Sequence, residues 1–163
     1  MSAQTVIGID VSRDWLDCFC LPEKQRFRFQ NSPDGHARLL EILQNMPDGL
    51  KIGFEATGGQ EWALWRVLIS MGINAVQLPP AQIKAFALSM GKRAKTDQID
   101  AELIARFMAF RPEAGRTLPD VKLQFLRALT VRRAQMVDAR KRLSAQISAR
   151  RKQGVSAELE DMD

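Results

Sequence analysis

The chain has 163 residues, of which 45% are hydrophobic and 26% are charged, and its formal net charge at pH 7 is +5. This length suits one domain with an appendage, and this composition is that of an ordinary globular protein. The apolar runs are too short to cross a membrane, no signal peptide is visible, and two cysteines with one histidine argue against a zinc cluster. These features predict a cytoplasmic protein.

The charges are distributed unevenly along the chain. Residues 1–60 hold six basic and eight acidic side chains, whereas residues 62–96 hold five basic residues and no acid. Residues 122–152 hold ten basic residues and one acid. An acidic amino-terminal part and a basic carboxyl-terminal part predict a polyanionic partner that the basic residues bind, with another role for the acids.

Apolar runs and alternating patterns predict five strands, at residues 5–11, 15–21, 26–29, 50–55 and 73–78. The first is apolar enough to be buried on both faces. The first three are joined by short links and therefore form an antiparallel meander, whereas helices separate the later strands. We expect these helices at residues 33–46, 60–71 and 80–90. The order predicts an α/β fold with a mixed five-stranded sheet, helices on both faces, and a site at the carboxyl ends of the central strands.

Two more helices are predicted after a basic loop at 91–95, one over about 96–110 and one from about 120 to 152. In the second helix, Leu129, Met136 and Leu143 repeat every seven residues, which predicts a coiled coil and a homo-oligomer. We therefore expect three segments: a domain over 1–112, a basic helical segment over 113–153, and a tail over 154–163.

Four carboxylates need an explanation. Asp10 is a single acid in an apolar strand, which is costly unless a partner pairs with it. Glu55 ends the fourth strand, and Asp97 and Asp100, three residues apart, would share one face of a helix. Structural alternatives exist. Asp10 could cap a turn or be neutralised by Arg13. Glu55 could be a first-turn acid that the dipole of the next helix favours. Asp97 could cap its helix, with Asp100 at the third position.

Taken together, these acids predict a metal site. Two unit charges about 4 Å apart repel by about 4 kcal/mol at an effective dielectric constant of about 20, so converging carboxylates require a cation. Oxygen ligands without histidine indicate Mg²⁺ or Mn²⁺, and a pair of such ions suits phosphoryl transfer. Basic side chains would then hold the phosphates of a nucleic acid, and the candidates are Arg13, Lys92, Arg93, Lys95, Arg132, Arg133 and Arg140.

Three motifs occur in order along the chain: Gly8-Ile9-Asp10-Val11-Ser12, Glu55-Ala56-Thr57-Gly58 and Lys95-Thr96-Asp97-Gln98-Ile99-Asp100-Ala101. Together they resemble the amino-terminal DEDD domain of IS110-family transposases, over about residues 5–150. The resemblance implies a RuvC-like fold of the ribonuclease H-like superfamily with a helical coiled-coil extension. It also implies that Asp10, Glu55, Asp97 and Asp100 are catalytic metal ligands. The family's members are DNA recombinases of prokaryotic insertion sequences that use a structured bridge RNA to select DNA, which implies a cytoplasmic, nucleoid-associated protein.

Full-length members of that family carry a second domain with a serine implicated as the nucleophile, and nothing in this sequence matches it. We therefore interpret the chain as a natural truncation or an excised domain that binds metal and nucleic acid without completing strand exchange. Two alternatives are a Holliday-junction-type nuclease and a non-catalytic, oligomerising fragment that binds nucleic acid. The Gly-Ile-Asp start also suggests an actin-like ATPase, but the two further phosphate loops of that class are not found.

Overall fold

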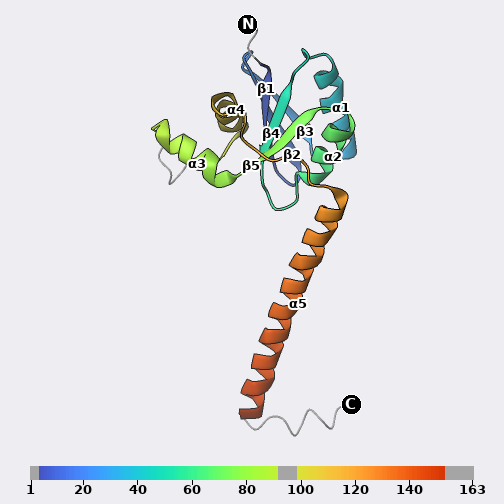
Figure 1. Cartoon of the computed structure of the whole chain (residues 1–163), viewed down its shortest axis with the longest axis vertical. Coiled ribbons are helices and arrows are strands. Elements are labelled where there is room, and N and C mark those ends of the chain that lie inside the picture. The colour runs from blue at the N-terminus through green and yellow to red at the C-terminus, as the bar shows by residue number, and fades with distance from the viewer. Residues whose placement is uncertain (1–3, 92–98, 153–163) are drawn as a thin grey trace. The chain divides into compact units, whose positions relative to one another are not determined.

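The computed structural model describes residues 4–91 and 99–152. The chain divides into two compact units, Met1–Leu118 and Pro119–Asp163. The strands, all in the first unit, are β1 (Val6–Val11), β2 (Trp15–Leu21), β3 (Gln25–Gln30), β4 (Lys51–Glu55) and β5 (Asn74–Leu78). The helices are α1 (Pro33–Gln44), α2 (Trp62–Ser70), α3 (Pro80–Ser89), α4 (Ala101–Phe110) and, in the second unit, α5 (Val121–Lys152) (Figure 1).

The strands form one sheet in the order β3-β2-β1-β4-β5. β1, β2 and β3 pair antiparallel, whereas β1, β4 and β5 pair parallel. This confirms the predicted α/β class and the mixed five-stranded sheet. β1 is the central strand, and its apolar sequence fits a position with a neighbouring strand on each side and helices on both faces.

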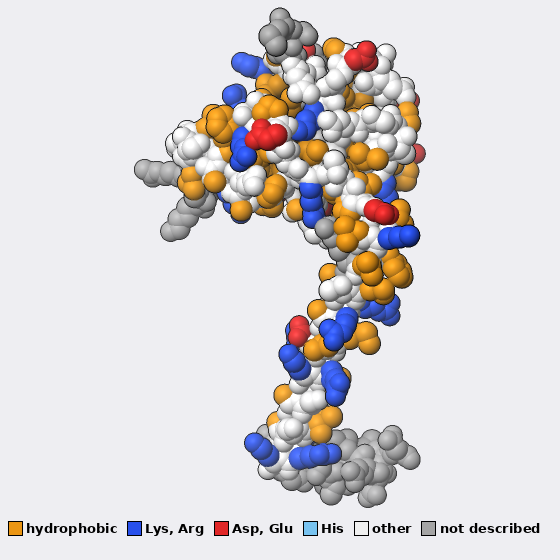
Figure 2. All heavy atoms as spheres, in the orientation of Figure 1, with side chains coloured by type: hydrophobic (Ala, Val, Ile, Leu, Met, Phe, Trp, Pro, Cys, Tyr) orange, Lys and Arg blue, Asp and Glu red, His pale blue; other side chains and the backbone are white. Residues whose placement is uncertain are grey.

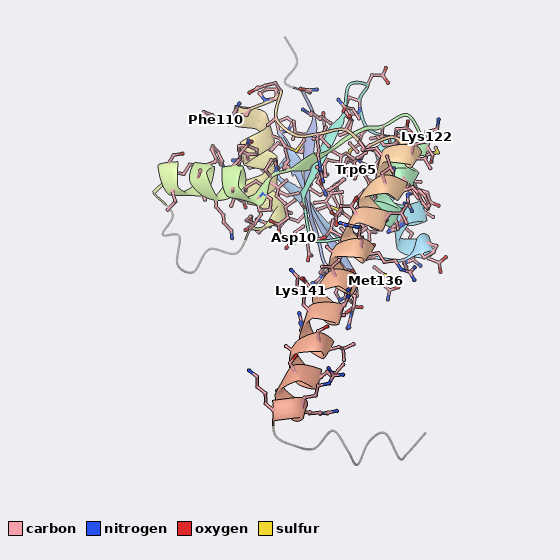
Figure 3. All side chains as sticks on the ribbon, turned by 60° about the horizontal axis from the view of Figure 1, so that its bottom comes forward. Asp10, Trp65, Phe110, Lys122, Met136 and Lys141 are labelled. Atoms are coloured by element: carbon pink, nitrogen blue, oxygen red, sulfur yellow. The ribbon has the colours of Figure 1, made fainter. Side chains whose placement is uncertain are left out.

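Helices cover both faces of the sheet, as predicted. α1 and α2 pack on one face through a cluster that includes Leu39 and Trp65, and α3 and α4 pack on the other through a cluster that includes Ile83 and Phe107. Figure 3 shows Trp65 of α2 and Phe110 of α4 on opposite sides of the strands.

β1 contributes to both clusters because successive side chains of a strand point to opposite faces. Ile7 and Ile9 lie in the cluster under α1 and α2, whereas Val6 lies in the cluster with α3 and α4. Asp10 is four residues from Val6, so it lies on the face that α4 covers.

The start of α4 differs from the prediction. The helix begins at Ala101 rather than near residue 96, and Asp100 precedes it in an extended conformation with φ −115° and ψ 170°. Asp100 is the N-cap, since its Oδ1 accepts a hydrogen bond from the backbone N–H of Leu103 at 2.7 Å. The expectation that Asp100 lies inside the helix was therefore wrong, and Asp97 lies outside the described residues.

α5 is a 32-residue helix where one was predicted. The apolar residues of its seven-residue repeat are exposed, at 46% for Leu129, 64% for Met136 and 59% for Leu143. Figure 2 shows hydrophobic and basic side chains intermingled along it. The coiled coil remains a prediction, as do the three predicted segments. No helix in the described ranges is long and apolar enough to cross a membrane.

Candidate metal centre

Asp10 lies between two other carboxylates on the sheet. On one side it pairs directly with Asp17 of β2, and opposed residues of an antiparallel pair share a face. On the other side, Ile9 pairs with Phe54 of parallel β4, and both side chains lie in the cluster under α1 and α2. Glu55, the next residue of β4, therefore lies on the same face as Asp10. β1, β2 and β4 thus deliver three acids to one edge of the sheet.

A fourth carboxylate, Asp100, is brought to this edge by the close approach of α4 to Gly8. Gly8 and Asp10 share a face of β1, and a Cβ built on Gly8 would lie 2.2 Å from the carbonyl oxygen of Ala101 and 2.5 Å from the amide nitrogen of Ala105. Only glycine permits this contact. Because Asp100 caps the same helix, the approach places its carboxylate beside Asp10.

Electrostatics at this edge disfavour the ionised acids. The pKa of Asp10 is raised by burial and by the negative charges of Asp17 and Asp100. The pKa of Glu55 is raised by burial and by Asp10, with Lys84 of α3 opposing the shift. These carboxylates therefore repel one another when ionised, which is the condition that a bound cation relieves.

The donor chemistry of this edge fits a hard divalent cation. No hydrogen bond or ion pair engages the carboxylates of Asp10 and Glu55 within the described ranges. The residues described do not include a ready-made group of three or more metal-binding side chains. Asp97, which the resemblance implies as a further ligand, lies outside them. Carboxylate oxygens without histidine suit Mg²⁺ or Mn²⁺.

A cavity of about 320 Å³ opens onto Asp10 but is not lined by Glu55. Asp10, Asp17 and Asp100 line it together with Arg26 and Arg28 of β3. Acids and arginines therefore face the same space, a combination that suits a bound cation beside a bound phosphate.

The loop that follows Glu55 is held by a buried acid, Glu61, which is 1% exposed. Its carboxylate accepts hydrogen bonds from the hydroxyl of Thr57 at 2.5 Å, the amide of Gly59 at 3.1 Å and the side-chain amide of Gln77 at 2.6 Å. Gly59 has φ +132°, a backbone conformation that other residues rarely adopt. This network fixes the path of the chain directly after Glu55.

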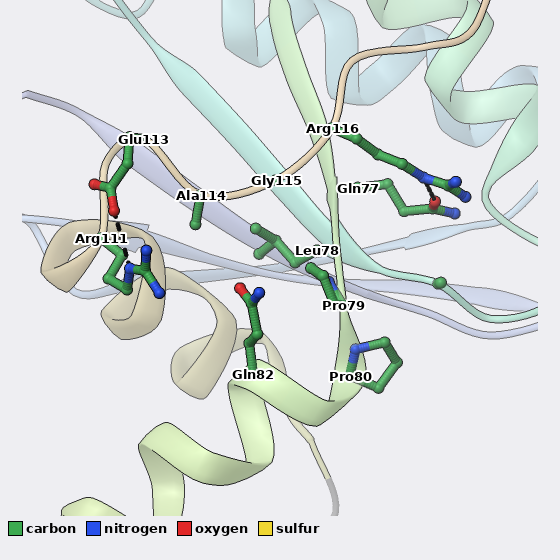
Figure 4. Close-up of a pocket in the computed structure, with 11 residues that line it drawn as sticks. Gln77, Leu78, Pro79, Pro80, Gln82, Arg111, Glu113, Ala114, Gly115 and Arg116 are labelled. Atoms are coloured by element: carbon green, nitrogen blue, oxygen red, sulfur yellow. Dashed lines mark hydrogen bonds and ion pairs between the residues drawn. The ribbon is translucent and has the colours of Figure 1, made fainter.

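A larger cavity of about 490 Å³ lies at the carboxyl end of β5 (Figure 4). Two arginines line it, and each already has a partner: Arg111 contacts Glu113 at 2.9 Å, and Arg116 donates to the side-chain oxygen of Gln77. Of the predicted carboxylates, the three that the structure describes are Asp10, Glu55 and Asp100, and none of these lines this cavity. The smaller cavity at Asp10 is therefore the stronger candidate for a metal site.

The other predicted site residues belong to three separate parts of the chain. Arg13 does not neutralise Asp10, because its guanidinium contacts Asp14 at 3.0 Å and its side chain is 81% exposed. The basic residues of α5 are exposed, namely Arg132, Arg133 and Arg140. Three members of the basic loop lie outside the described residues, namely Lys92, Arg93 and Lys95.

Asp17, Arg26 and Arg28 line the cavity but were missed in the sequence. The signal for Asp17 was the hairpin: a tight link between the first two strands opposes residues at equal distances from the turn, which pairs Asp10 with Asp17. In the sequence, Arg26 and Arg28 are the polar residues of a strand in which polar and apolar residues alternate. The sequence does not show that their face of this strand meets the acids.

Comparisons with known proteins identify the family of the chain. A protein-family model for the DEDD transposases of IS110 elements, described as "Transposase", matches residues 7–150. The pilin gene-inverting proteins of Moraxella lacunata and Moraxella bovis are each 33% identical over 114 residues, which cover 66% of this chain and 35% of the relative. The chain therefore spans about a third of the length of these relatives.

Solved structures of RuvC from Thermus thermophilus are also similar. One has a TM-score of 0.46 and 18% identity, and covers 69% of this chain and 99% of that chain. RuvC in complex with a Holliday junction substrate has a TM-score of 0.43 with 18% identity, and covers 69% of this chain and 98% of that chain.

Proposed function

Because the chain belongs to the IS110 family of DEDD transposases, we propose that it is the catalytic domain of a metal-dependent DNA recombinase acting on phosphodiester bonds. The observation that carries the proposal is the convergence of Asp10, Glu55 and Asp100. Three separate segments bring these acids to one edge of the sheet, where burial, and then like charges, raise the pKa values of Asp10 and Glu55. Asp97, from the third family motif, is proposed as the fourth ligand.

The four carboxylates would hold Mg²⁺ or Mn²⁺. When bound, such ions supply Lewis-acid stabilisation of the attacking and leaving oxygens of a phosphodiester. Asp10 is the central ligand, since Glu55 follows on the neighbouring strand β4 and α4 brings Asp100 beside it. The Oδ1 of Asp100 already accepts from Leu103, which orients the carboxylate and leaves Oδ2 for the ion. Glu55 is placed by the end of β4 and by the loop that Glu61 organises.

DNA and a structured guide RNA are proposed as the partners. The basic residues named above would contact phosphates rather than bases, which favours binding without reading of sequence. The exposed apolar repeat of α5 supports a homo-oligomer formed through this helix. A recombinase of an insertion sequence would act in the prokaryotic cytoplasm, on DNA of the nucleoid.

The chain spans 35% of the length of the pilin gene-inverting proteins. For the residues described, the proposal comprises metal binding and DNA binding.

Titration calorimetry with MgCl₂ and MnCl₂ tests the metal site. The wild-type chain should bind the divalent ion, and Asp10→Asn should weaken binding by at least about tenfold, because it removes the central ligand. Asp48→Asn is the matched control, since Asp48 is an exposed acid that precedes β4 at the end opposite Glu55. Absence of binding by the wild type would refute the metal-dependent function.

Branched DNA separates the remaining alternatives. Cutting of a four-way junction in Mn²⁺ by this chain, lost in Asp10→Asn, would support the junction nuclease. DNA binding in the presence of a chelator, with no heat of metal binding, would support the non-catalytic fragment.

A further inference from the structure

On the face of the sheet that carries Asp10, side chains of β2 lie beside two arginines of β3. In the antiparallel register, Asp17 pairs with Arg28 and Phe19 pairs with Arg26. Phe19 packs against Ala101 and Ala105 of α4, which identifies this face as the one covered by that helix. Arg26 and Arg28 are two residues apart on β3, so both point to the same side.

Each arginine is held by one carboxylate and one aromatic ring. Arg28 contacts Asp17 at 3.0 Å through Nε and at 3.3 Å through Nη2, and its guanidinium carbon lies 4.9 Å from the ring centre of Trp15. Arg26 contacts Glu102 of α4, and its guanidinium carbon lies 4.7 Å from the ring centre of Phe19. A charged partner and a stacked ring restrict the rotamers of a long side chain, so both groups are ordered before any ligand arrives.

Both guanidinium groups nevertheless remain available. The side chains of Arg26 and Arg28 are each 61% exposed. A guanidinium has five N–H donors, and the contacts with Asp17 engage only Nε and Nη2 of Arg28. An exposed ion pair contributes at most about 1 kcal/mol, so a phosphate can share the arginine with its carboxylate or replace it. The planar fork of arginine suits two phosphate oxygens at once.

The cavity of about 320 Å³ joins these arginines to the candidate metal ligands. A nucleic acid strand that enters it meets Asp10, Asp17 and Asp100, which repel its phosphates. Arg26 and Arg28 line the same cavity and oppose that repulsion. Alternate residues of a strand lie about 6.5 to 7 Å apart, which is comparable to the spacing of successive phosphates along a nucleic acid backbone.

The geometry points to a phosphate-binding subsite, formed by Arg26 and Arg28, that holds the phosphodiester backbone of a nucleic acid strand beside the carboxylates. This inference rests on the proposed function and extends it, because neither arginine belongs to the family motifs or to the predicted basic segments. Neither arginine is a proposed metal ligand, so binding of DNA to the subsite can be measured in a chelator.

The test compares the double variant Arg26→Gln/Arg28→Gln with the wild type by fluorescence anisotropy. The ligands are labelled single-stranded DNA and a labelled four-way junction, in EDTA, over a salt series. The double variant should bind about tenfold or more weakly, and the slope of log K against log salt should fall in magnitude by about 1.4 to 1.8, since each lost phosphate contact removes about 0.7 to 0.9. Competition with inorganic phosphate distinguishes a strand site from a simple anion site. Displacement of the DNA from the wild type only at high phosphate supports a strand site, and displacement at low millimolar phosphate overturns it.

Arg38→Gln is the matched control, because Arg38 is an exposed arginine of α1, on the opposite face of the sheet. It should leave affinity and salt slope unchanged. Circular dichroism shows whether each variant is folded. If the double variant is unfolded, Arg28→Lys replaces it; this change keeps the positive charge and removes the fork, and it should weaken binding severalfold.

The outcomes separate the two proposals. Wild-type affinity and slope in the folded double variant, or in Arg28→Lys when the double variant does not fold, would overturn the subsite and leave the recombinase proposal standing. Failure of the wild type to bind either DNA would refute the DNA partner, and the subsite with it.

Discussion

Gly8→Ala is the most informative single change in the sheet, because it alters the position of α4 without touching a carboxylate. The added Cβ would lie 2.2 Å from the carbonyl oxygen of Ala101, 2.5 Å from the amide nitrogen of Ala105 and 3.0 Å from the Cβ of Ile104. Two of these are backbone atoms, so no rotamer change relieves the overlap. The start of α4 must retreat by about 1 Å or more to reach ordinary van der Waals contact.

This retreat has two measurable effects. Overpacking a core contact costs about 1 to 3 kcal/mol, which lowers the melting temperature of a domain of this size by roughly 5–15 °C. Asp100 moves with the helix that it caps and leaves Asp10, so the affinity for Mg²⁺ or Mn²⁺ should fall by about tenfold to a hundredfold. Circular dichroism gives the first quantity, and calorimetry on the folded protein gives the second.

Gly53→Ala is the matched control. Gly53 lies on the same face one strand away, but its added Cβ would meet the end of a flexible side chain, the sulfur of Met108 at 2.2 Å. That side chain can rotate, so metal affinity should stay near the wild-type value. Wild-type metal affinity in folded Gly8→Ala would refute the reasoning that the contact at Gly8 places Asp100.

The remaining predictions concern charge and burial. Asp10→Asn should raise the melting temperature of the metal-free protein at pH 7, because it removes a charge that its neighbours repel. A metal concentration a hundred times the dissociation constant should stabilise the wild type by about 2.7 kcal/mol and the variant far less; equal shifts would contradict the site. In the absence of metal, the raised pKa values mean that the folded state binds protons more tightly than the unfolded state. The free energy of unfolding contributed by these groups should therefore decrease as pH rises from the ordinary carboxyl pKa through the raised values, and Asp10→Asn should reduce this dependence in urea titrations. Glu61→Gln should destabilise the fold by about 1 to 3 kcal/mol, since an amide cannot accept all the hydrogen bonds of the buried carboxylate; an unchanged urea midpoint, equal to that of the exposed control Glu41→Gln, would contradict this.

Most of the fold prediction came from the spacing of apolar residues along the chain and from residues that form turns. The five strands and the starts of α1 at Pro33 and α3 at Pro80 follow from local patterns, and the structure has them. The start of α4 could not be read in this way. Two aspartates three residues apart offer two caps, and tertiary contact with Gly8 decides where the helix lies.

The candidate site was predictable to the extent that it depends on strand ends. Asp10 and Glu55 follow from parallel neighbours whose carboxyl ends meet at one edge. Arg26 and Arg28 did not follow, because their role depends on the register of β2 against β3 and on the face that α4 covers. Register is a pairwise property, and no single strand's sequence contains it.

The side chain of Asp100 has two separate roles, namely to cap α4 and, as proposed, to bind a cation. Asparagine or serine at this position would still accept the hydrogen bond from Leu103 and start the helix, whereas neither supplies the negative charge proposed for the ion. Folding and chemistry can therefore be lost independently here. A descendant that had lost the proposed activity could carry serine at this position and keep its architecture, whereas a side chain at Gly8 would cost stability. We expect decayed copies of such a sequence to lose their acids before they lose this glycine.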